Sequence, residues 1–120
     1  MSTIPAIATP GLMMVRWTAR TLGLLLLLFW GAFFVEHLVE WFSSAGPTPP
    51  MLVVWISLAH LIMLAGFLVA WKRELAGSVM IVIGALAFFS QAAGRNFPLF
   101  FGITVIPAVL YFYYWWETRS

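Results

Sequence analysis

Apolar residues follow one another in four long stretches, and polar residues gather in the short segments between them. The stretches cover residues 21–42, 51–71, 75–93 and 97–116. Each is close to the roughly 20 apolar residues that a helix, rising about 1.5 Å per residue, needs to cross a hydrocarbon core of about 30 Å. The pattern predicts an all-α fold, a transmembrane bundle of four helices.

The segments between the stretches leave no room for a second domain. They are residues 43–50, 72–74 and 94–96, and connections of this length join neighbouring helices directly. Residues 1–14 contain prolines and a glycine and show no regular apolar period. We therefore expect a cytoplasmic N-terminal arm over residues 1–14, irregular or lying on a partner, and a single transmembrane domain over residues 15–120.

Composition strengthens the membrane interpretation. Hydrophobic residues make up 63% of the chain and charged residues 8%, and the mean hydropathy is +1.01. A soluble helical chain would interleave polar positions at helical spacing. The chain has no cysteine, which excludes disulfides and thiolate metal sites.

The basic residues predict the orientation of the bundle. Five of the six lie at the end that both termini share, namely Arg16, Arg20, Lys72, Arg73 and Arg119. Only Arg95 lies at the other end. Lysines and arginines beside membrane spans are retained on the cytoplasmic side, so we expect both termini in the cytoplasm (N-in/C-in). Because the basic residues form no stripe, we expect no nucleic-acid partner.

Three local patterns resemble those of a known family. They are Arg16-Trp17-Thr18-Ala19-Arg20-Thr21-Leu22-Gly23 before a leucine run, Ala70-Trp71-Lys72-Arg73-Glu74 followed by Gly77, and Pro107 followed by Trp115-Trp116. In these patterns the chain resembles small uncharacterised four-helix bacterial membrane proteins, which are known only as a domain of unknown function. The resemblance spans most of the chain. It implies a four-helix bundle in a bacterial cytoplasmic membrane and assigns no activity.

Small residues predict where the helices pack most closely. Ala59 and Gly66 are seven residues apart in the second stretch, and so are Gly77 and Gly84 in the third. Close helix approach in lipid relies on small residues, and a seven-residue spacing suits left-handed packing of the hairpin that these stretches form. Pro107 is expected to kink the fourth helix, because it removes a backbone hydrogen bond.

The main candidate for chemistry is a polar cluster near the outer end of the bundle. Its members are Glu36, His37, Glu40, Ser57, Gln91 and Arg95. The first three fall within about a 100° arc of one helix. Counted from the cytoplasmic ends, Glu40 and Arg95 lie level at about 30–31 Å, so we expect an ion pair between them. A layer of Glu36, His37 and Gln91 is expected just beneath that pair.

Several interpretations of this cluster compete. As a structural network it would fix helix register through hydrogen bonds. As a functional site it would hold a proton or a divalent cation, for which a histidine and two carboxylates are suitable ligands. Contact with a partner subunit or with bound lipid is a third interpretation. A single Glu-His-x-x-Glu run does not reproduce the paired motifs of di-iron bundles, so the structural network is favoured and no metal site is expected.

His60 and His37 are the candidate cofactor ligands. Helix rises place the two residues about 9 Å apart in depth, so we expect that no haem iron is held by both. Ligation of a haem or a chlorophyll by one histidine is left open. The favoured interpretation is a neutral His60 that bonds to Ser57 or to a backbone carbonyl. Thr104 is expected to bond to the carbonyl four residues before it.

Enzyme chemistry finds no support in the sequence. There is no aspartate for a Ser/His/Asp set and no glycine-rich phosphate loop. The favoured function is a noncatalytic accessory or structural subunit that packs through lipid-facing helix surfaces in a larger membrane complex. One alternative is a small homo-oligomeric ion or proton channel or transporter. The other is a protein that contacts haem, a pigment or a quinone through its aromatic residues, which make up 18% of the chain.

Overall fold

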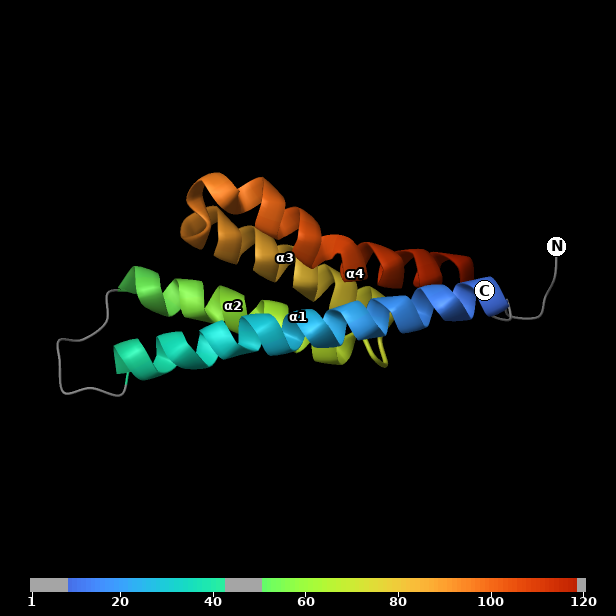
Figure 1. Ribbon diagram of the computed structural model, residues 1–120, viewed down its shortest axis with the longest axis horizontal. Helices are drawn as coiled ribbons and strands as arrows, with labels where there is room; N and C mark the ends of the chain where they lie inside the picture. Colours follow the sequence, from blue (N-terminus) through green and yellow to red (C-terminus); the bar gives the residue numbers. More distant parts are fainter. Residues whose placement is uncertain (1–8, 43–50, 119–120) are drawn as a thin grey trace.

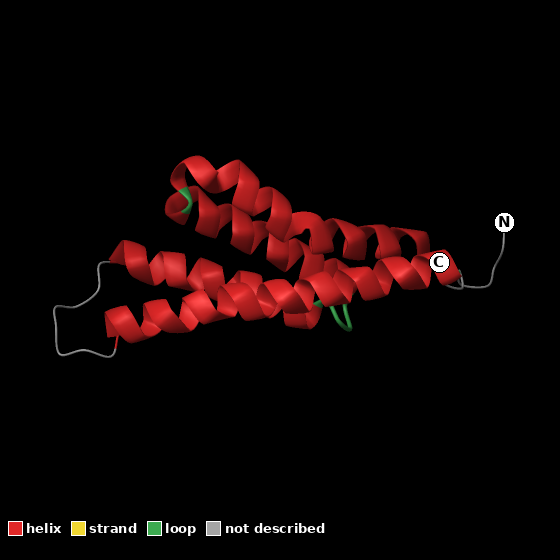
Figure 2. Ribbon diagram, in the orientation of Figure 1, coloured by secondary structure: helices red, strands yellow, loops and turns green. Residues whose placement is uncertain are grey.

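The structure is a computed structural model that describes residues 9–42 and 51–118. Its elements are α1 (Pro10–Phe42), α2 (Met51–Val69), α3 (Glu74–Ala92), the short 3-10 helix η1 (Gly94–Asn96) and α4 (Phe97–Thr118) (Figures 1 and 2). All four α-helices are long and apolar enough to cross a membrane. Within the described residues, the prediction of an all-helical fold with four such helices is confirmed.

Helix α1 begins earlier than the sequence pattern predicts. Its first residue is Pro10, whereas the apolar stretch begins at residue 21. The Thr9 hydroxyl accepts a hydrogen bond from the Leu12 amide at 3.2 Å, and the Thr9 carbonyl accepts one from the Met13 amide at 2.9 Å. A capping threonine followed by proline at the first helical position is a helix start. Residues 10–14 are therefore helical and not irregular, the contact of this arm with a partner stays a prediction, and residues 1–8 lie outside the described residues.

The helices pack in a partial ring. Helix α2 packs most extensively on α3, α3 on α4, and α4 on α1, whereas α1 and α2 share fewer contacts and the described backbones of α1 and α3 are not neighbours. Helix α1 begins and α4 ends at one end of the molecule, which we call the closed end (Figure 1). At the opposite end, which we call the open end, the α3–α4 hairpin diverges from α1 and α2 (Figure 1).

Glycines allow the close contact between α2 and α3. A Cβ built on Gly84 would lie 2.5 Å from the Met63 amide nitrogen, and one built on Gly66 would lie 2.8 Å from the Ile81 amide nitrogen. At Gly77 a Cβ would overlap Ala70. The predicted packing of this hairpin through small residues is thus confirmed, since any larger residue at these positions would push the two backbones apart.

The connection from α3 to α4 depends on one backbone conformation. Gly94 has a φ of 57°, in the left-handed region where glycine ends helices without steric cost. One 3-10 turn then leads directly into α4. Further along, Pro107 lies inside α4 with its side chain fully buried, and the kink expected there stays a prediction.

We predict that Gly84→Ala lowers the free energy of unfolding by about 1–3 kcal/mol, because the new methyl group overlaps the Met63 backbone. The control is Gly102→Ala, since a Cβ at Gly102 meets nothing within 4 Å and should be neutral or slightly stabilising. Unfolding by sodium dodecyl sulfate titration in mixed micelles measures both. Equal stability of the two variants would contradict the close α2–α3 contact.

Candidate functional site

The predicted acidic residues lie at the open end, on the last turns of α1. Glu36, His37 and Glu40 are all exposed. The His37 Nδ1–H donates a hydrogen bond to the carbonyl of Phe33 on the same helix at 2.7 Å. A carbonyl can only accept, so this bond fixes the ring orientation and places the proton on Nδ1.

The expected ion pair between Glu40 and Arg95 is not formed in the described part of the chain. Arg95 is exposed in η1, and the backbones of α1 and η1 are not neighbours. Gln91 is likewise exposed, near the end of α3, and does not join Glu36 and His37 in a layer. The physical reason is that the α3–α4 hairpin diverges from α1 and α2 at this end (Figure 1). The depth count assumed straight helices and therefore did not predict this separation.

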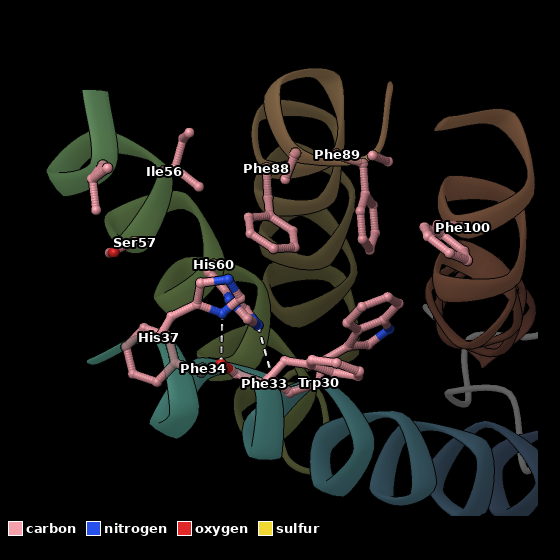
Figure 3. A pocket seen from close by; sticks show the side chains of 13 residues that line it. Trp30, Phe33, Phe34, His37, Ile56, Ser57, His60, Phe88, Phe89 and Phe100 are labelled. Atoms are coloured by element: carbon pink, nitrogen blue, oxygen red, sulfur yellow. Dashed lines mark hydrogen bonds between the residues drawn. The ribbon is translucent and has the colours of Figure 1, made fainter. Parts of the chain in front are cut away.

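The divergence creates a cavity of about 270 Å³ between the hairpins. Its walls carry six aromatic side chains, those of Trp30, Phe33, Phe34, Phe88, Phe89 and Phe100. Three predicted site residues also line it, namely His37, Ser57 and His60 (Figure 3). The structure therefore brings together both candidate histidines and one hydroxyl, and it separates them from Glu40, Gln91 and Arg95.

His60 forms the buried part of this cavity wall. Its side chain is 2% exposed, and its Nε2–H donates to the Trp30 carbonyl at 3.0 Å. The imidazole stacks on Phe88 at 4.2 Å between centroids and meets the edge of Phe34 at 5.1 Å. Of the two partners expected for His60, the structure gives the backbone carbonyl rather than Ser57.

Trp30 is a central residue that the sequence analysis missed. Its indole Nε1–H donates to the Thr104 hydroxyl at 3.1 Å, and the bond is buried. The indole also contacts Phe88 and Phe89 of α3 at 6.4 and 4.9 Å between centroids. Thr104 thus accepts a hydrogen bond from α1, whereas only a bond to its own helix was expected. No local sequence signal marks this pair, because the two residues are 74 positions apart.

Two arginines attach α1 to the rest of the bundle at the closed end. Arg16 forms an ion pair with Glu74 at 2.9 Å, and the carboxylate side chain is 12% exposed. The same guanidinium donates to the Tyr114 hydroxyl at 3.3 Å. Arg20, one turn later, donates to the Trp71 carbonyl at 2.7 Å. These bonds join α1 to the first residue of α3, to α4 and to the turn between α2 and α3.

Two tryptophan rings also contact the Arg20 side chain. Its guanidinium carbon lies 4.8 Å from the ring centroids of both Trp17 and Trp71, so the cation is in contact with two aromatic faces. The sequence signal was present, since Arg16, Trp17 and Arg20 fall on one helix face.

The described residues contain no group of three or more histidines and carboxylates that could hold a metal ion. One ring nitrogen of His37 and one of His60 are the atoms at this cavity that could bind a ligand. The arrangement is suited to binding an apolar ring through stacking and hydrogen bonds.

The comparisons with known proteins identify the family. Residues 8–120 match the domain of unknown function DUF7670. This match covers nearly the whole chain, so the protein belongs to that family. No curated protein and no solved structure matches the chain.

We predict a measurable coupling between Trp30 and Thr104. A double-mutant cycle with Trp30→Phe and Thr104→Val removes each partner of the hydrogen bond while keeping an apolar side chain. The coupling free energy should be about 0.6 kcal/mol and no more than about 1.7 kcal/mol, the range found for hydrogen bonds between membrane helices. Strictly additive changes in unfolding free energy would show that the bond contributes nothing.

Proposed function

We propose that this family member is a noncatalytic structural subunit of a larger complex in the bacterial cytoplasmic membrane. The observation that carries the proposal is a shallow groove of about 640 Å³ on the outer side of α2 and α3. Small residues form part of its floor, namely Ala59, Gly84 and Ala87. Grooves of small residues are where membrane helices approach each other closely, so a helix of another subunit fits this surface.

A polar group at one end of the groove supports the same proposal. Gln91 lines the groove and is exposed, and its side-chain amide has no hydrogen-bond partner within the part of the chain that the structure describes. Side-chain amides on membrane helices are stabilised by hydrogen bonds to a neighbouring helix. A partner helix in the groove would offer Gln91 such a bond.

We further propose that the closed end faces the cytoplasm. Arg16, Arg20, Lys72 and Arg73 lie there, and Arg95 lies at the open end. The retention of basic residues on the cytoplasmic side favours this orientation. Both termini would then be cytoplasmic, and η1 would face outward.

A channel or transporter receives less support from the described residues. Three polar side chains buried in the bundle are those of His60, Ser78 and Thr104. Each of these three takes part in a hydrogen bond, with the carbonyl of Trp30, the carbonyl of Leu75 and the indole of Trp30 respectively, whereas the buried Tyr111 hydroxyl has no partner among the described residues. Polar groups that are already paired in this way favour a structural role over an ion path.

The assembly prediction compares two alanines on α3 that are both exposed. Ala87→Trp fills the groove, whereas Ala76→Trp places the same side chain outside it. Purified from native membranes in a mild detergent, the wild type should contain a second polypeptide at fixed stoichiometry. The Ala87→Trp variant should lose it and Ala76→Trp should keep it, as read by native mass spectrometry. A wild-type monomer would contradict the proposal, and an assembly of this chain alone would favour the channel alternative.

The orientation prediction uses the absence of cysteine from the chain. In intact cells an impermeant thiol reagent should label Asn96→Cys, in η1, and should leave Lys72→Cys unlabelled until the membrane is permeabilised. The reverse pattern would show that the closed end faces outward.

A further inference from the structure

The cavity at the open end has a graded exposure from floor to mouth. At the floor, His60 is 2% exposed and Trp30 is 9% exposed. At the mouth, Phe33 is 39% exposed and His37 is also exposed. Both imidazoles therefore line the cavity beside its aromatic walls, that of His60 buried and that of His37 exposed (Figure 3).

Each of the two imidazoles keeps one ring nitrogen that can accept a hydrogen bond. His60 uses its Nε2–H for the Trp30 carbonyl, and His37 uses its Nδ1–H for the Phe33 carbonyl. A neutral imidazole has one N–H donor, so the remaining nitrogens, His60 Nδ1 and His37 Nε2, carry lone pairs. Neither of these nitrogens has a partner among the described residues. Backbone carbonyls hold the rings in this tautomer, as they do for histidines whose second nitrogen binds a ligand.

The volume of the cavity limits the size of its occupant. A volume of about 270 Å³ falls below the range of roughly 300–1,000 Å³ for pockets that hold drug-sized ligands. It exceeds the roughly 150 Å³ of a cavity that binds benzene. One substituted aromatic ring therefore fits, and a haem, which is larger than a drug-sized molecule, does not.

We propose that this cavity binds the ring of a hydroquinone, an aromatic ring with two hydroxyl groups at opposite positions. The ring stacks among the phenylalanines, in the offset and edge-on geometries that aromatic pairs prefer. One hydroxyl donates to His60 Nδ1 at the floor and the other to His37 Nε2 at the mouth. The site goes beyond a structural role in a complex and does not depend on one.

The polarity of these hydrogen bonds predicts selectivity for the reduced ring. A quinone of the same shape carries two carbonyl oxygens, which accept hydrogen bonds and cannot donate them. Its oxygens would face the lone pairs of the two histidines without a proton between them. Loss of two hydrogen bonds makes the oxidised ring about 5- to 150-fold weaker in binding.

The experiment compares three probes that share one carbon frame: tetramethylhydroquinone, tetramethylbenzoquinone and tetramethylbenzene. The protein is held in lipid nanodiscs without a histidine tag and without oxygen, with its two histidines labelled at the ring nitrogens with ¹⁵N. We expect tetramethylhydroquinone to shift the signals of both unprotonated nitrogens in a saturable way. The quinone and the hydrocarbon should bind more weakly than the hydroquinone, by about fivefold or more.

Variants separate the site from general partition into lipid. Ala93 lines the cavity, so Ala93→Phe should fill it and abolish the shift of His60. His37→Phe keeps an aromatic side chain, and it should weaken hydroquinone binding and reduce the preference over the quinone. Glu36→Gln, beside His37 and outside the cavity lining, is the matched control and should bind as the wild type does. Thermal unfolding verifies that each variant is folded.

Several results would overturn the proposal. Equal or tighter binding of the quinone would show that the hydroxyl groups of the ligand donate no hydrogen bond to the two histidines. Equal binding of tetramethylbenzene would identify an apolar cavity for acyl chains. The absence of a saturable shift in the wild type, or its persistence in folded Ala93→Phe, would show that the ring does not occupy this cavity.

Discussion

The open half of the bundle depends on the way Trp30 is bonded. Its carbonyl accepts a hydrogen bond from His60 of α2, and its indole N–H donates one to Thr104 of α4. Its ring contacts Phe88 and Phe89 of α3 and bridges the space between α1 and α3, whose described backbones are not neighbours. Unpaired polar groups are costly in hydrocarbon, so these two bonds fix the rotation and depth of α1.

Side-chain size explains why the bundle is tight along α2–α3 and divergent at the open end. Gly77 and Gly84 let α3 approach α2 closely. One turn beyond Gly84, the sequence changes to Phe88 and Phe89, which face Trp30 across the bundle. Rings of this size hold the α3–α4 hairpin away from α1, and the cavity is the space that they only partly fill.

The sequence predicts the helices well and their side-chain contacts poorly. Hydrocarbon thickness sets the length of an apolar span, so the boundaries of α2, α3 and α4 lie within two residues of those predicted. The start of α1 was missed because its signal is Thr9-Pro10, a capping pattern rather than an apolar one. The partners of Glu40 and Thr104 depend on the rotation and the tilt of each helix. Counting residues along straight helix axes gives depth and neither of these two quantities. The two histidines share a cavity although their backbones differ in depth, because helical side chains point back toward the N-terminus.

The separation of Trp30 and Thr104 along the chain has a consequence for biogenesis. Helix α1 is made before the other three described helices, yet the partner of its Trp30 indole lies 74 residues later, in α4. Helices α2 and α3, joined by a turn of four residues between Val69 and Glu74, can pair as soon as both are inserted, since their contacts are local. The indole N–H of Trp30 therefore has no access to this partner until α4 has been made, whereas the bond from His60 to the Trp30 carbonyl can form as soon as α2 is present.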